Sequence, residues 1–299
     1  MRRDIESATA IFTGAAGNRL VSDVFGDSGP PVLLLHGGGQ TRHSWRETSQ
    51  QLAAAGSVAY ALDQRGHGDS EWVADGAYAF PDFAADATVV ADALAGRAGR
   101  APVVVGASLG GIAAMLAEGA AAQAGRVPVS AALILVDITP RVDIDGVAKI
   151  QGFMRAHAEE GFASITEAAD AVAAYLPHRP RPRSHEGLKK NLRLDADGRW
   201  RWHWDPRFLD GPRPVGTGRG QTEAALVDAA RRIAVPALLV RGTWSELVTE
   251  DHVREFLELV PHAEYMDVAG ARHMVAGDRN DRFSAAIMSF LGKLDQRQP

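Results

Sequence analysis

The feature that most constrains the fold of this chain is a regular alternation of short apolar runs with longer segments of helical periodicity. The apolar runs are rich in Val, Leu, Ile and Ala, and they lie at 31–35, 57–62, 103–105, 132–136, 237–240 and 263–268. Helical patterns lie between or after them, at 44–55, 82–95, 109–123, 250–260 and 282–294. Continuous apolar strands that alternate with helices are typical of a mostly parallel sheet with helices on both faces. The sequence therefore predicts an α/β fold.

Two other segments depart from this rhythm. Residues 10–12 and 20–25 alternate in polarity around a Gly/Asn turn, which predicts an antiparallel hairpin at the edge of the sheet. Residues 141–232 carry helical patterns and then the segment 177–183, whose prolines exclude a regular helix or inner strand. We interpret 141–232 as an inserted, mainly helical lid between two parts of one core, residues 1–140 and 233–299.

Composition excludes several classes of function. The chain has 299 residues, 46% of them hydrophobic and 23% charged, as in an ordinary globular protein with a substantial core. The net charge of −5 predicts neither nucleic acid nor an anionic membrane as a partner. Cysteine is absent, which excludes disulfides and thiolate nucleophiles. No apolar run is long enough to span a bilayer and the N-terminus does not look like a secretory signal, so we expect a cytoplasmic protein.

The pentapeptide Gly106-Ala107-Ser108-Leu109-Gly110 indicates a nucleophile. It follows the β-branched run at 103–105 and precedes a stretch of small residues compatible with a helix. A strand that turns sharply into a helix around Ser108 would hold the serine oxygen above the sheet, and glycines are needed where the turn is tight. We therefore expect Ser108 to be a catalytic nucleophile.

With this order of elements, the chain resembles the α/β-hydrolase fold family over nearly its whole length. Four motifs carry the resemblance, and their order makes them more specific together than singly: His36-Gly37-Gly38-Gly39, the segment 63–70 (DQRGHGDS), the pentapeptide around Ser108, and Gly270-Ala271-Arg272-His273-Met274. Within the family it is most similar to the branch of small esterases, epoxide hydrolases and haloperoxidase-like enzymes.

The resemblance also implies the partners of the serine. The family places its general base where His273 stands, after the last apolar strand, whereas His36 and His67 are expected to be structural. The base needs a carboxylate to orient it, and the loop after 237–240 offers Glu246, where similar proteins usually have Asp. Asp137, after the strand at 132–136, is the alternative acid.

An oxyanion hole and a substrate pocket are expected close by. The backbone N–H of Leu109 begins the helix after the serine, and by resemblance the second donor is Gly38. Trp45 and Trp244 adjoin the expected oxyanion and acid loops, so we expect both to contact substrate, together with Gly39. Trp204 is a further expected substrate contact; it belongs to the tryptophan-rich segment 199–205, which either faces the pocket or anchors the lid to the core.

The nucleophile selects the class of reaction. Epoxide hydrolases and haloalkane dehalogenases of this fold use an aspartate where this chain has Ser108, so both activities are disfavoured. We therefore predict a serine hydrolase that acts on small to medium hydrophobic carboxylic esters, as a monomer or homodimer. The alternatives are a lactonase, a C–C bond hydrolase or a perhydrolase with the same triad, and a ligand-binding homologue without turnover. No metal or other cofactor is expected, because the sequence contains no Walker loop, no His-Glu-x-x-His motif and no dinucleotide fingerprint after a strand.

Overall fold

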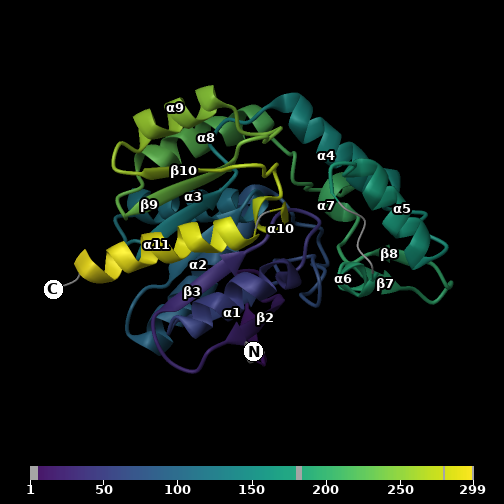
Figure 1. Cartoon of the computed structure of the whole chain (residues 1–299), viewed down its shortest axis with the longest axis horizontal. Helices are drawn as coiled ribbons and strands as arrows, with labels where there is room; N and C mark the ends of the chain where they lie inside the picture. Colours follow the sequence, from purple (N-terminus) through teal and green to yellow (C-terminus); the bar gives the residue numbers. More distant parts are fainter. Residues whose placement is uncertain (1–5, 180–183, 279, 298–299) are drawn as a thin grey trace.

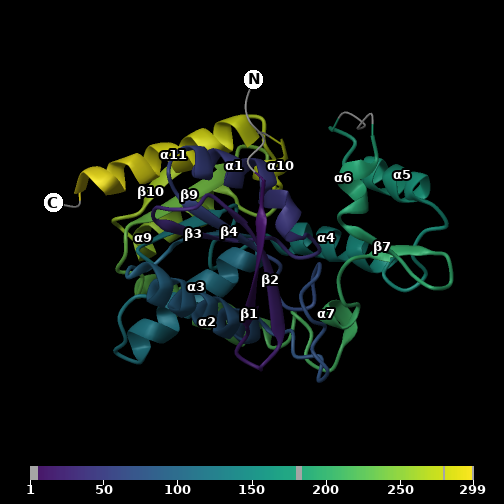
Figure 2. The same cartoon turned by 90° about the horizontal axis from the view of Figure 1, so that it is seen from below.

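The computed structural model describes residues 6–179, 184–278 and 280–297. Eight of its strands form one sheet in the order β1-β2-β4-β3-β5-β6-β9-β10 (Figures 1 and 2). The strands are β1 (Ala8–Thr13), β2 (Arg19–Phe25), β3 (Pro31–Leu35), β4 (Val58–Leu62), β5 (Val103–Ala107), β6 (Ala132–Val136), β9 (Ala237–Gly242) and β10 (Glu264–Val268). The pairs from β4 to β10 are all parallel, whereas β1 and β2 form an antiparallel hairpin at one edge. The predicted α/β-hydrolase fold is confirmed.

Helices cover both faces of this sheet. Successive side chains of β3 point to opposite faces, so that Val32 and Leu34 enter one hydrophobic core while Leu33 and Leu35 enter the other. One face packs against α1 (Arg46–Ala54), which begins directly after the buried Trp45, and against α11 (Asn280–Arg297), which contains the buried Phe283. The other face is covered by α2 (Phe80–Ala98), α3 (Leu109–Gln123), α8 (Arg219–Arg231) and α9 (Glu250–Leu259).

The long connection from β6 to β9 lies largely beside this core. It contains α4 (Ile144–Ala156), α5 (Ile165–Tyr175), α6 (Glu186–Lys189), the antiparallel pair β7 (Leu192–Leu194) and β8 (Trp200–Trp202), α7 (Arg207–Asp210) and α8. Both views show α4 to α7 as a separate group at one end of the molecule (Figures 1 and 2). The range 141–232 assigned to the lid also contains α8, which packs on α3 so closely that a side chain at Gly119 would overlap Ala229.

Buried polar contacts fix this connection to the core. The Asp205 carboxylate, which is 1% exposed, accepts a hydrogen bond of 2.6 Å from the Tyr78 hydroxyl and is paired with Arg207 at 2.7 Å. Arg207 donates in turn to the backbone oxygens of Val73 and Ala74 in the core. Asp205, the last residue of the tryptophan-rich segment 199–205, therefore anchors this connection to the core. Anchoring is one of the two roles considered for the segment.

No helix in the described part of the chain is both long enough and apolar enough to cross a membrane.

Candidate active site

Ser108 lies in the tight turn between β5 and α3. Its backbone has φ 47° and ψ −112°. Residues other than glycine rarely adopt this conformation, because it costs free energy. The flanking glycines make this turn possible, because a Cβ at Gly106 would lie 2.5 Å from the Gly110 oxygen, and one at Gly110 would overlap the Leu35 carbonyl. Within the described chain, no hydrogen bond engages Ser108 Oγ, so the hydroxyl is available to a ligand.

His273 and Asp137 form the polar pair next to this serine. His273 Nδ1 lies 2.8 Å from Asp137 Oδ2, and the carboxylate of Asp137 is fully buried at the end of β6. A carboxylate can only accept here, so Nδ1 carries the proton and Nε2 is left as the basic nitrogen. Asp137 is itself held by hydrogen bonds from the Gly242 amide at 3.0 Å and the Ser245 hydroxyl at 2.5 Å.

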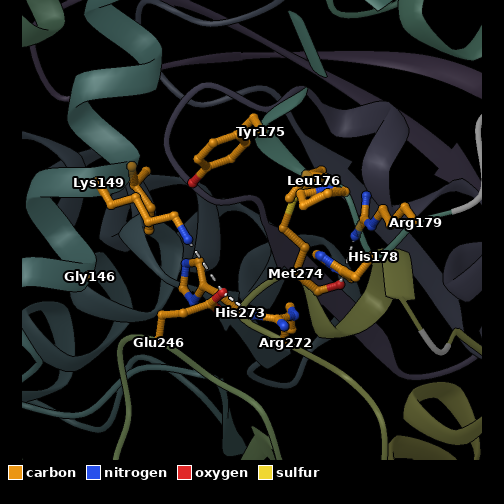
Figure 3. A pocket seen from close by; sticks show the side chains of 12 residues that line it. Gly146, Lys149, Tyr175, Leu176, His178, Arg179, Glu246, Arg272, His273 and Met274 are labelled. Atoms are coloured by element: carbon orange, nitrogen blue, oxygen red, sulfur yellow. Dashed lines mark hydrogen bonds and ion pairs between the residues drawn. The ribbon is translucent and has the colours of Figure 1, made fainter. Parts of the chain in front are cut away.

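The prediction that Glu246 orients His273 is wrong. The Glu246 carboxylate is paired with Arg272 at 2.6 Å and lies 4.0 Å from the Lys149 ammonium group (Figure 3). The loop after β9 instead turns Ser245 toward the histidine's partner, and β6 is the direct neighbour of β9 in the sheet. The alternative acid, Asp137, occupies the position. The feature of the sequence that indicated Asp137 was the position of its carboxylate directly after a fully apolar strand.

Two residues that line the cavity with Ser108, Gly38 and Leu109, have backbone N–H groups with no acceptor in the described chain. In the turn after β3, Gly37 N–H donates to Gln40 Oε1 at 3.2 Å and Gly39 N–H donates to His67 Nε2 at 3.1 Å. These bonds leave the Gly38 N–H without an acceptor in the described chain. Leu109 is the first residue of α3, where an N–H has no acceptor within the helix. The structure thus places the two predicted oxyanion donors, Gly38 and Leu109, on the wall of the cavity that Ser108 lines.

Two fully buried histidines hold this glycine turn. His67 accepts from Gly39 through Nε2, and His36 accepts at 3.1 Å from the Gln64 amide. Each ring also places Nδ1 within 2.9 Å of a backbone carbonyl, so both are neutral with the proton on Nδ1. Burial lowers the pKa of His36 to about 4 and that of His67 to about 3. Both histidines contact only protein groups in these bonds, as a structural role requires.

This pair makes stability depend on pH. The unfolded chain takes up protons on His36 and His67 below about pH 6.5, whereas the folded chain resists them until pH 4 or below. The stabilisation from the neutral rings is therefore complete above pH 6.5 and is lost as the pH falls. We expect the free energy of unfolding to drop by about 2 kcal/mol per histidine between pH 7.5 and pH 5. Urea unfolding at both pH values measures this drop, and a His67→Gln variant should show a smaller one. Equal unfolding free energies at pH 7.5 and pH 5 would contradict it.

A cavity of about 1040 Å³ opens over these groups, and its walls are mostly apolar. Of the four predicted substrate contacts, Trp45, Gly39 and Trp204 line it. Trp45 is also a core residue, since its ring packs 5.8 Å from that of Phe283. Trp244 does not line the cavity and is 66% exposed, so its prediction is wrong: the loop after β9 turns its side chain outward.

Most of the apolar wall comes from the β6–β9 connection and was not singled out in the sequence. These residues include Val147, Ile150, Phe153, Met154, Val172, Phe208 and Leu226. For the first five of these residues, the signal in the sequence was the helical periodicity at 147–159 and 165–175, which predicts a buried face without saying what that face covers. In the described residues, no group of three or more His, Asp or Glu side chains has the arrangement of a metal site.

Comparison with known proteins places this geometry in a family. A model of the family described as "Alpha/beta hydrolase family" matches residues 32–286, which include the glycine turn, Ser108, Asp137 and His273. The chain belongs to the α/β-hydrolase family.

Individual relatives agree with this assignment. An esterase of Mycobacterium tuberculosis is 32% identical over 279 residues, which cover 91% of this chain and 85% of the relative. A solved structure of the same esterase superposes with a TM-score of 0.73 at 28% identity, over 98% of this chain and 93% of that one. The 2-(acetamidomethylene)succinate hydrolase of Mesorhizobium japonicum is 28% identical over 271 residues, 88% of each chain.

Proposed function

We propose that this α/β-hydrolase cleaves carboxylic esters with Ser108 as nucleophile, His273 as general base and Asp137 as the acid that orients it. The observation that carries the proposal is the hydrogen bond between His273 Nδ1 and the buried Asp137 carboxylate, because His273 lines the same cavity as Ser108. The similarity to the M. tuberculosis esterase over most of both chains supports ester hydrolysis as the activity.

Each group then has a defined role. His273 Nε2 takes the proton from Ser108 Oγ as that oxygen attacks the ester carbonyl carbon. The negative charge that develops on the carbonyl oxygen is stabilised by the N–H groups of Gly38 and Leu109, each worth on the order of 3 kcal/mol in the transition state. The imidazolium gives its proton to the departing alcohol, and a water molecule activated by His273 hydrolyses the acyl-enzyme to release the acid and restore Ser108.

The β6–β9 connection acts as the lid in this proposal. Residues of α4, α5 and α7 form much of the apolar wall above the serine, so they select the hydrophobic part of the substrate. The anchor at Asp205 keeps one end of this lid in a fixed position over the glycine turn.

The size of the cavity predicts a preference for medium-length acyl chains. In a p-nitrophenyl ester series from acetate to octanoate, we expect kcat/KM to increase by about tenfold from acetate to hexanoate. Each buried methylene contributes up to about 0.8 kcal/mol, although part of this is lost in ordering the chain. A flat profile, or one that falls from acetate onward, would contradict the assignment of the apolar wall to the acyl chain.

The same series tests the proposed activity. Turnover that disappears when a serine-directed phosphonate reacts with the protein supports a serine esterase. An absence of turnover together with an absence of phosphonate labelling would contradict it, and would favour the ligand-binding alternative.

A further inference from the structure

A second, smaller cavity adjoins the first at His273. It has a volume of about 220 Å³, enough for a small polar group but not for a whole ester of medium length. His273, Ile150, Tyr175, Leu176, Arg179 and Met274 line both cavities. A substrate whose carbonyl lies at Ser108 can therefore extend one arm past His273 into the smaller space.

The charged residues of this smaller cavity are mostly cationic. Lys149, Arg179 and Arg272 are among its lining residues, and Glu246 is the single carboxylate among the described residues that line it. Lys149 and Arg272 both pair with that carboxylate, at 4.0 Å and 2.6 Å, so one negative charge is shared by two positive charges (Figure 3). Among the described lining residues, three cationic side chains therefore accompany one carboxylate.

Apolar residues lie beside these cations. Ile150, Leu176 and Met274 line the same cavity, and apolar walls increase the attraction between charges at a given distance. The Lys149 and Arg272 side chains are 58% and 39% exposed, so water and salt also screen their charges. The cations also come from three separate parts of the chain: Lys149 from α4, Arg179 from the segment after α5, and Arg272 from the loop before α10 (Val275–Asp278). A concave site with convergent cations next to the reacting groups is suited to an anionic part of the substrate.

We propose that the cavity lined by Lys149, Arg272 and Glu246 is a subsite for a carboxylate on the ester substrate, so that preferred substrates carry one negative charge besides the ester. This inference rests on the proposed esterase function. Glu246, the acid first expected in the triad, has a different role here: it holds Lys149 and Arg272 in place and limits the positive charge of the subsite.

Matched pairs of charged and neutral esters test the subsite. One pair carries the charge on the acyl side, as the p-nitrophenyl monoester of hexanedioic acid against p-nitrophenyl hexanoate. The other carries it on the alcohol side, as 4-(butanoyloxy)butanoate against pentyl butanoate. We expect kcat/KM for the charged member to exceed that of the neutral member by about tenfold in at least one pair. Raising the salt to about 1 M should reduce this preference, because the Debye length falls to about 3 Å.

Lys149→Gln is the variant that isolates the charge. We expect it to reduce the charged-to-neutral ratio of kcat/KM by about fivefold, since one of the two cations on Glu246 is gone. Lys293→Gln is the matched control, because Lys293 also pairs with a carboxylate, that of Glu264, but on α11 and outside both cavities. The control should leave both ratios unchanged.

The outcomes separate the two proposals. Equal kcat/KM for charged and neutral esters, or a preference that Lys149→Gln does not reduce, would overturn the subsite while leaving the esterase intact. An absence of hydrolysis of all four esters would overturn the proposed function and, with it, the subsite.

Discussion

Replacing Ser108 with alanine is expected to lower kcat for p-nitrophenyl hexanoate by about 10⁵-fold. The variant keeps the cavity and the oxyanion donors but has no oxygen to form the acyl-enzyme. Removal of the nucleophile from a serine–histidine–aspartate site lowers kcat by a factor of this order. Steady-state kinetics with active-site titration of the wild type measures the effect.

Ser44→Ala is the matched control for this experiment. Ser44 lines the same cavity, but its hydroxyl donates to the Thr41 carbonyl at 2.9 Å and has no place in the proposed chemistry. It should keep kcat within a few-fold of the wild type, and the Ser108→Ala protein should retain the circular dichroism spectrum of the wild type. A Ser108→Ala enzyme with more than a tenth of the wild-type kcat would rule out Ser108 as the nucleophile.

The second large effect on kcat is expected at Asp137, and it distinguishes Asp137 from Glu246 as the acid of the triad. Asp137→Asn is expected to lower kcat by about 10⁴-fold, because an amide can present its NH₂ group to His273 Nδ1 and so favour the tautomer with the proton on Nε2. A ring in that tautomer cannot accept the proton of Ser108. Glu246→Gln, assayed with the same neutral ester, should change kcat by no more than about threefold, because Glu246 is bonded to Arg272 and not to His273.

Stability must be measured alongside, since Asp137 also accepts from Gly242 and Ser245. Asparagine keeps one acceptor oxygen, so we expect a loss of about 1–3 kcal/mol in the free energy of unfolding but a folded protein at 25 °C. The reverse pattern, an inactive Glu246→Gln and an active Asp137→Asn, would restore the acid first expected from the sequence.

The sequence predicts the fold and the serine because both depend on local signals. Strand-length apolar runs and helical periodicity determine which residues are buried, and the glycines around Ser108 are required by contacts within one turn. His273 follows from its place after the last strand, and the structure brings it to the cavity of Ser108.

The acid could not be chosen from the sequence because it depends on how two neighbouring strands end. Asp137 follows β6 and Glu246 follows β9, and nothing local to either shows which carboxylate reaches His273. The conformation of the loop after β9 decides which carboxylate is used, because it turns the Ser245 side chain toward Asp137. The same conformation turns Trp244 outward, so the two wrong predictions have one cause.

The apolar wall and the cationic cavity depend on still longer-range packing. Periodicity in the lid identifies faces that must be buried, but the serine that they cover lies in another part of the chain. Lys149, Glu246 and Arg272 are far apart in the sequence, and only the packing of α4 against the loops after β9 and β10 brings their charges together.

The most direct test of the proposed active site is mass spectrometry of the protein after reaction with a serine-directed fluorophosphonate, with residual turnover of p-nitrophenyl hexanoate measured on the same samples. The proposed mechanism predicts one adduct per chain, located on Ser108, a loss of turnover in proportion to labelling, and no adduct on the Ser108→Ala variant. Labelling at another residue, or full turnover from protein labelled at Ser108, would contradict the assignment of Ser108 as the nucleophile.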